Sequence, residues 1–104
     1  MAMARAPWDL LREKDADMAT MHEQLDSMAL GDGRLSKKVK LLMAMAIDAS
    51  HGKEGGVRVY GGRAKEAGAT DEEIFEAVRV ATLISGTSGQ TTALRGLDAL
   101  LRGA

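Results

Sequence analysis

The sequence of 104 residues contains no cysteine and only two histidines. Without a thiol, the chain has no disulfide, no thiolate metal ligand and no thiol nucleophile. The histidines, His22 and His51, stand far apart, and neither belongs to a tight cluster of His, Asp and Glu. We therefore expect no metal ion and no other cofactor, and we exclude cysteine redox chemistry.

Proline and aromatic residues are also scarce. The chain has one proline, and aromatic residues make up 3% of it, so a core must come from Ala, Leu, Val, Ile and the seven Met. Apolar residues recur at helical spacing, and this length suits one domain. We predict an all-α fold, a small bundle of five to six helices, that forms a single domain over residues 1–104.

Neither an excess of charge nor a long apolar run is present. The 14 basic residues nearly balance the 15 acidic ones, so the basic stripe typical of nucleic-acid binders is missing. The longest apolar run, residues 41–47, is too short to span a bilayer, and residues 1–7 do not begin a signal peptide. We expect no nucleic-acid partner, no membrane partner and a cytoplasmic location.

The apolar spacing also predicts where the helices lie. Residues 1–13 form an N-terminal arm or a short helix. In the next helix, Met18, Met21, Leu25 and Met28 share one face and are expected to fill the core. The predicted helices after the N-terminal segment cover residues 15–28, 37–50, 54–67, 71–85 and a last segment that ends at 102.

Local signals mark several helix ends. Ser36 is a suitable N-cap for the helix over 37–50. Thr70 and Glu73 have the spacing of a capping box, in which each side chain accepts a hydrogen bond from the other residue's amide. The glycine-rich segment 86–89 is expected to break the chain between the last two helices.

The helix over 37–50 is apolar on every side from Leu41 onward, except at Asp48. A helix of this kind must be buried all round, and a chain this short has little interior. We therefore predict that another subunit covers part of it. A carboxylate among apolar neighbours is costly unless paired, so Asp48 faces solvent, meets Lys53 or Arg58, or helps to form a site.

The order of these segments carries a family resemblance. Leu35-Ser36 leads into the apolar helix, HGKEGGVRVY follows over residues 51–60, and KEAGATDEEIFEAVRVA covers 65–81. This arrangement resembles the carboxymuconolactone decarboxylase and alkyl hydroperoxidase D superfamily over about residues 35–101. The resemblance implies an alkyl hydroperoxidase D-like fold and a homo-oligomer, commonly a trimer or a hexamer. It places the site at the start of the helix after the apolar one, near subunit contacts.

The peroxidase branch of that superfamily uses a Cys-x-x-Cys pair, a His four residues on and a Glu one helix earlier. Aligned with this motif, the chain has Lys53 and Gly56 at the cysteine positions, Tyr60 at the His position and Leu41 at the Glu position. Peroxide reduction by this route needs a thiolate and a resolving thiol. Thiol peroxidase activity is therefore not expected, despite the resemblance.

The lactone decarboxylase branch has no cysteine pair and carries a charged segment that contains histidines at the same place. A cation, a Glu and an Arg are kept in kind at Lys53, Glu54 and Arg58, whereas the two His positions are Gly55 and Tyr60. The segment thus resembles the decarboxylase branch more than the peroxidase branch, without reproducing its site.

A lactone that bears carboxylates needs cations to hold it and a group that transfers a proton at carbon. Lys53 and Arg58, with Asp48 nearby, are the candidate substrate-binding residues. Glu54, His51 and Tyr60 are the candidate catalytic residues. The anion would also be favoured by the amides of the helix start.

Each of these residues also has a purely structural interpretation. Lys53, Glu54 and Arg58 fit a solvated helix face, in which Glu54 and Arg58 are an ordinary pair one turn apart. His51 fits a loop, and Tyr60 fits a core or an interface. Two functions therefore stay open. One is a lyase-type enzyme that performs cofactor-free acid–base chemistry on a small anionic molecule, and the other is a non-catalytic oligomeric binding protein.

Overall fold

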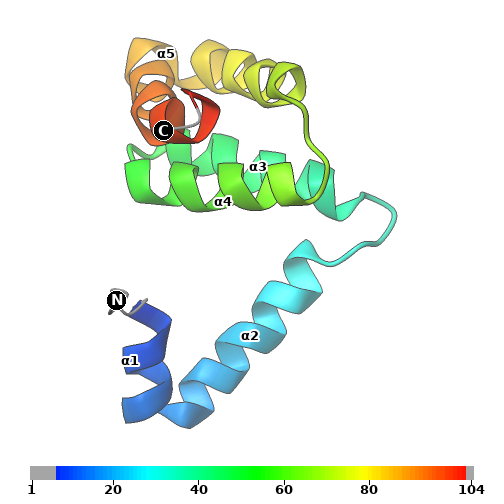
Figure 1. Ribbon diagram of the computed structural model, residues 1–104, viewed down its shortest axis with the longest axis vertical. Helices are drawn as coiled ribbons and strands as arrows, with labels where there is room; N and C mark the ends of the chain where they lie inside the picture. The colour runs from blue at the N-terminus through cyan, green and yellow to red at the C-terminus, as the bar shows by residue number, and fades with distance from the viewer. Residues whose placement is uncertain (1–6, 103–104) are drawn as a thin grey trace. The chain divides into compact units, whose positions relative to one another are not determined.

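The computed structural model describes residues 7–102, which form five helices and no strand. The predicted all-α class is thus confirmed, and the helix bounds agree with the expected ones to within a few residues. Figure 1 shows the helices in chain order: α1 (Pro7–Lys14), α2 (Ala16–Leu30), α3 (Lys37–Ser50), α4 (Glu54–Glu66) and α5 (Asp71–Arg102).

The chain divides into two compact units, residues 1–31 and residues 32–104. In the first unit, α1 packs on α2 through the ring of Trp8, whose centroid lies 4.4 Å from that of His22, and through an ion pair between Arg12 and Glu23. The predicted arm or short helix at residues 1–13 therefore contains a helix from Pro7. The prediction of one domain over the whole chain stays a prediction.

The apolar face of α2 is not a core. Met18, Met21, Leu25 and Met28 are all exposed, so the expectation that they fill the core was wrong. Ala19 is the one buried side chain among residues 7–31. Two short helices enclose too little volume to cover such a stripe.

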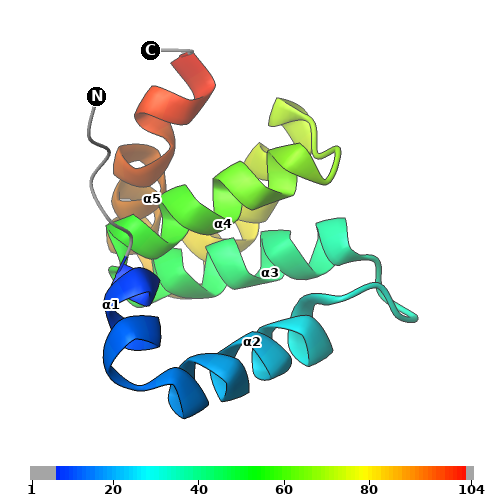
Figure 2. The same cartoon turned by 60° about the horizontal axis from the view of Figure 1, so that its bottom comes forward.

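The second unit holds the hydrophobic core. Both views show α3 and α4 side by side, with α5 folded against them (Figures 1 and 2). The buried apolar side chains of this unit are Leu41, Met45 and Ala49 of α3, Val57 and Ala64 of α4, Ala69, and Ile74, Val78, Ala81, Ala93 and Leu97 of α5.

Two glycines let α4 approach the later part of α5 closely. A Cβ atom on Gly61 would lie 2.7 Å from a methyl carbon of Leu97, and one on Gly96 would lie 2.6 Å from a methyl carbon of Val57. Position 61 therefore serves close helix packing, whereas Gly62 has open space around it. Tight packing of this kind holds α4 in a fixed position.

Both predicted N-caps are present. The Ser36 hydroxyl accepts a hydrogen bond from the amide of Val39 at 3.2 Å. The Glu73 carboxylate accepts from the amide of Thr70 at 2.9 Å, and the Thr70 hydroxyl accepts from the amide of Glu73 at 3.1 Å. The Lys38 ammonium also donates to Glu73 at 2.8 Å, so the start of α5 is tied to α3.

The predicted break in the last helical region lies at Gly86. Its backbone has φ 70° and ψ −160°, a conformation open almost only to glycine. This residue divides α5 into a first arm, residues 71–85, and a second arm, residues 87–102. The chain turns sharply between the two arms (Figure 1). The arms therefore form a helical hairpin.

One side of α3 is buried and the other is not. Leu41, Met45 and Ala49 face the core of the unit, whereas Val39, Met43 and Ile47 are exposed. The all-round burial expected for this helix is therefore not reached within one chain. None of the helices in residues 7–102 combines the length and the apolar character needed to cross a membrane.

Candidate functional site

The turn between α3 and α4 brings the predicted site residues to one end of the second unit. Gly52 takes a positive φ of 73°, which allows the tight reversal after α3. The amide of Lys53 then donates a hydrogen bond to the carbonyl of Asp48 at 2.8 Å. Lys53 is the N-cap of α4, and its side chain makes no capping hydrogen bond.

Asp48 lies against the first turn of α4. A Cβ atom on Gly56 would lie 2.6 Å from Cγ of Asp48, so only glycine at position 56 leaves room for the carboxylate there. The Asp48 side chain is half-buried. Its negative charge stands at the positive end of the α4 dipole, where an N-cap carboxylate would normally stand. Asp48 thus lies beside the uncapped start of α4, although its carboxylate accepts no hydrogen bond from an α4 amide among the described residues.

This arrangement changes the expectation for an anionic ligand. The amides at the start of α4 favour negative charge, but the chain's own Asp48 already lies against that turn. A substrate carboxylate must compete with Asp48 for this place and is repelled by it. The pairing of Asp48 with Lys53 or Arg58 is not made among the described residues.

Tyr60 lies on the same edge of α4 as Gly56. It is half-buried, and the guanidinium of Arg63 stands over its ring at 5.7 Å from the centroid. That distance is within the range of a cation–π interaction. Tyr60 and Asp48 are therefore the two candidate residues that the fold places on one edge and partly shields from water.

Glu54 and Arg58 lie on the other edge. At about 100° per residue, Arg58 is turned roughly 160° around α4 from Tyr60. Both charged side chains are exposed, as are those of His51 and Lys53. The turn therefore brings Asp48, His51, Lys53 and Glu54 close together along the chain, whereas Arg58 and Tyr60 lie further along α4 and point to nearly opposite edges.

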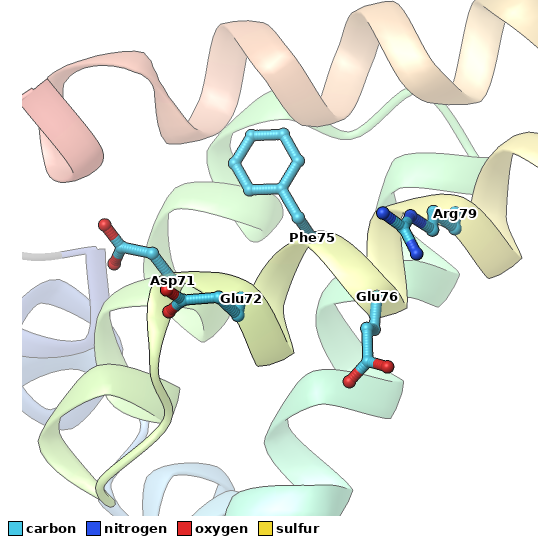
Figure 3. Close-up of a pocket in the computed structure, with 5 residues that line it drawn as sticks. All are labelled: Asp71, Glu72, Phe75, Glu76 and Arg79. Atoms are coloured by element: carbon cyan, nitrogen blue, oxygen red, sulfur yellow. The ribbon is translucent and has the colours of Figure 1, made fainter.

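Several hollows of the described chain lie elsewhere, on the first arm of α5 and between its two arms. Three adjoining cavities of about 450, 320 and 310 Å³ share Phe75. Figure 3 shows the Phe75 ring pointing toward the second arm, while the Glu76 carboxylate points away from it. None of the six candidate residues lines these three cavities.

Sequence reasoning missed these cavities because Phe75 lies one residue outside the buried stripe that contains Ile74 and Val78. The chain's single phenylalanine at the edge of that stripe is the signal that points to them. Arg79 and Arg102 stand at their rims.

Three carboxylates, those of Asp71, Glu72 and Glu76, line the first cavity beside Arg79. In the third cavity Arg102 is paired with Asp98. The charges therefore do not favour an anionic ligand there.

Clear shifts of pKa occur outside the candidate site. The hydrogen bond from Lys38 and the amide of Thr70 hold the pKa of Glu73 below its usual value. The carboxylate of Asp98 raises the pKa of Arg102 by a hydrogen bond. Among residues 7–102, no three His, Asp or Glu side chains stand close enough together to hold a metal ion.

Comparison with known proteins gives two findings. The profile of the Carboxymuconolactone decarboxylase family matches residues 16–99, a span that extends beyond the segment on which the sequence resemblance rests. The crystal structure of an apo carboxymuconolactone decarboxylase family protein from Legionella pneumophila is similar, with a TM-score of 0.85 and 26% sequence identity. The similarity covers 90% of this chain and 84% of that one. No curated protein matches the chain.

Proposed function

The chain belongs to the carboxymuconolactone decarboxylase family, and from that premise we propose that it is a cofactor-free acid–base enzyme for a small carboxylated lactone or a related acid. One observation supports this most directly. The fold holds an ionisable carboxylate, that of Asp48, half-buried against α4 on the edge that also carries Tyr60. Two groups able to exchange protons thus stand where water is partly excluded.

The reaction needs residues that bind the substrate and a residue that delivers a proton, and both kinds occur on α4 and the turn before it. Decarboxylation breaks a carbon–carbon bond, releases carbon dioxide and leaves an electron pair that shifts the double bond. The carbon at the far end of that shift then takes up a proton. Lys53 and Arg58 hold the substrate carboxylates, Asp48 turns them away from the helix start, and Tyr60, His51 or Glu54 delivers the proton.

Such a site needs a second copy of the chain. His51, Lys53, Glu54 and Arg58 are exposed in one chain, and acid–base groups act most strongly where water is excluded. Val39, Met43 and Ile47 on one face of α3 are also exposed in a single chain, and a second copy would bury them. We therefore propose a homo-oligomer, a trimer or a hexamer, that works in the cytoplasm.

A specific observation favours a second candidate function. Arg58 and Tyr60 lie on nearly opposite edges of α4, so a substrate held by Arg58 does not face Tyr60 within one chain. With the anion-binding residue and the proton donor turned apart, the chain can bind a small anion without converting it. The second candidate function is therefore a non-catalytic binding protein that keeps the family fold. Binding by Lys53 and Arg58 then takes place without turnover.

The test uses a panel of carboxylated lactones and related acids. We expect carbon dioxide release from at least one, with Arg58→Ala raising KM roughly tenfold or more, because a charge-assisted hydrogen bond contributes about 1.5–3 kcal/mol. Arg95→Ala, at another exposed arginine, serves as the control and keeps the wild-type KM. Ligand binding without turnover favours the second function, and neither binding nor turnover removes both.

A further inference from the structure

The exposed methionines of α2 present thioether sulfur to solvent. Met18, Met21 and Met28 have exposed fractions of 48%, 62% and 76%. The expectation of no metal ion rested on cysteine, His, Asp and Glu, and these methionines were assigned to the core. Exposed thioethers are ligands of a different kind, because they bind soft cations such as Cu(I) in preference to hard ones.

Two of these methionines share one turn of α2 with a histidine. Met18, Met21 and His22 stand at positions i, i+3 and i+4 of the helix, and they are called the Met–His cluster below. Residues three and four apart on a helix are neighbours, with about 5–6 Å between their Cβ atoms. Long side chains on a helix lean toward the preceding turn, so Met21 and His22 lean toward Met18. Two sulfur atoms and one ring nitrogen can therefore reach one point above this turn.

The ring of Trp8 lies beside the histidine of the cluster. Its centroid is 4.4 Å from that of His22, and α1 folds back beside the start of α2 (Figure 2). Trp8 and His22 also line a small hollow together with Ala19, the buried residue of α2. A histidine that binds a metal is usually held by a neighbouring group, and the face of an indole ring attracts a cation. The first unit thus places a suitable ring at the edge of the cluster.

Negative charge predominates in the first unit. In residues 7–31, Asp and Glu outnumber Lys and Arg by six to two, and one of the two basic residues, Arg12, is already paired with Glu23. A surplus of negative charge raises the local concentration of cations. Because no three carboxylates or histidines of this unit's described residues stand together, the choice among cations falls to the sulfur atoms.

We propose that the Met–His cluster is a binding site for a soft monovalent cation, Cu(I), with Trp8 beside it. Thioether and imidazole ligands suit Cu(I), whereas Ca²⁺ and Mg²⁺ need oxygen ligands. Zn²⁺ takes thiolate, imidazole or carboxylate ligands, usually four in a structural site, and the cluster supplies one of them. The site uses none of the residues assigned to the proposed reaction.

A protein partner is the other occupant of the methionine face. An apolar partner that covers Met18 also buries the His22 imidazole, which stands one turn further along α2. Among the described residues this imidazole makes a ring contact and no hydrogen bond, and burial of an unpaired polar group costs free energy. A metal ion instead satisfies a ring nitrogen by coordination, so the histidine favours the metal.

The first experiment follows the fluorescence of Trp8, the one tryptophan of the chain. Silver nitrate in a chloride-free buffer supplies Ag(I) as the probe, because Ag(I) is soft and keeps its oxidation state in air. We expect saturable quenching in the wild type. Met18→Leu should weaken binding at least about tenfold, since loss of a supporting group at a metal site already costs about 10–100-fold.

Met43→Leu is the matched control of this experiment. Met43 has the same exposed fraction as Met18, 48%, but stands on α3. The variant therefore loses an equally accessible thioether and should keep the wild-type affinity for Ag(I). Circular dichroism should show the same helix content in both variants.

The second experiment uses Cu(I) itself. Cu(I) is bound to a coloured chelator in the absence of oxygen, and its transfer to the full chain is measured by the loss of colour. His22→Phe removes the ring nitrogen and keeps an aromatic ring against Trp8, and we expect it to take up Cu(I) at least about tenfold more weakly. An excess of Zn²⁺ should leave the bound Cu(I) in place, because thioether ligands select Cu(I).

Three outcomes overturn the proposal. They are a wild type that binds neither cation, an affinity that is unchanged in Met18→Leu or in His22→Phe, and displacement of Cu(I) by Zn²⁺. The first of them leaves the methionine face to a protein partner. Neither experiment uses a lactone or an organic acid, so its result is independent of a failure to find turnover.

Discussion

Glu73 joins α3 to the start of α5 through a single carboxylate. It accepts hydrogen bonds from the Lys38 ammonium at 2.8 Å and from the Thr70 amide at 2.9 Å. Asp48 also lies at a helix start, against Gly56 of α4, but it makes no such hydrogen bond among the described residues. At the scale of single residues, Glu73 is thus the carboxylate that ties two helices of the second unit together.

The contact of Glu73 predicts a dependence of stability on pH. Because Lys38 and the Thr70 amide lower the pKa of Glu73 in the folded chain, its contribution is fully present above the unfolded value of about 4.3. The contribution is lost as the pH falls through the folded pKa. Urea unfolding at a series of pH values should show a flatter dependence below about pH 5 in Glu73→Gln than in the wild type.

Glu72→Gln is the control, because it removes the same charge from the same turn and leaves the contact with Lys38 in place. An equally steep dependence in Glu73→Gln contradicts the role given to Glu73.

The contact between Asp48 and Gly56 predicts coupled substitutions. Gly56→Ala forces the carboxylate away from α4, whereas in Asp48→Ala the space is already free. We expect a double-mutant cycle on the free energy of unfolding to give a coupling of about 1 kcal/mol. Costs that simply add in the double variant contradict the contact.

At the scale of elements, helix ends and helix periods could be predicted from the sequence because they depend on neighbouring residues. Ser36, Thr70 and Glu73 form the expected caps, and the break at Gly86 divides α5. The exposure of α2 could not be predicted in this way. Its methionine stripe has helical spacing, but what covers a stripe depends on distant parts of the molecule.

The backbone conformation of Gly86 predicts that adding one methyl group at this position lowers the stability of the fold. Gly86→Ala places a side chain on a backbone that only glycine adopts readily, at a cost of about 1–3 kcal/mol. Gly62→Ala is the matched control, because it meets nothing within 4 Å and stands inside α4. There alanine should stabilise the helix by up to about 1 kcal/mol. Thermal unfolding of the two variants should shift in opposite directions.

At the scale of the whole molecule, the buried apolar side chains of residues 7–102 lie in the second unit, apart from Ala19. The turn from Asp48 to Lys53 was foreseen, because it follows from helix ends near in sequence, whereas the site assigned to it stays a prediction. Its geometry was not foreseen. The angle between Arg58 and Tyr60 and the exposure of Glu54 depend on how α4 is rotated against α3 and α5.

The division into two units predicts that residues 32–104 fold without the rest. We expect this fragment to be helical and to unfold cooperatively, because α3, α4 and α5 bury one another's apolar side chains. The fragment 1–31 should be largely unfolded, since chains of this length rarely fold alone. Circular dichroism measures the helix content and the thermal unfolding of both fragments. An unfolded fragment 32–104 contradicts the division into two units.

The space taken by the Asp48 carboxylate at residue 56 has an evolutionary consequence. By its resemblance to the peroxidase branch, residue 56 corresponds to one of the two reactive cysteines. A side chain there must displace the neighbouring acid, so a thiol at residue 56 is accommodated at less cost when residue 48 changes with it.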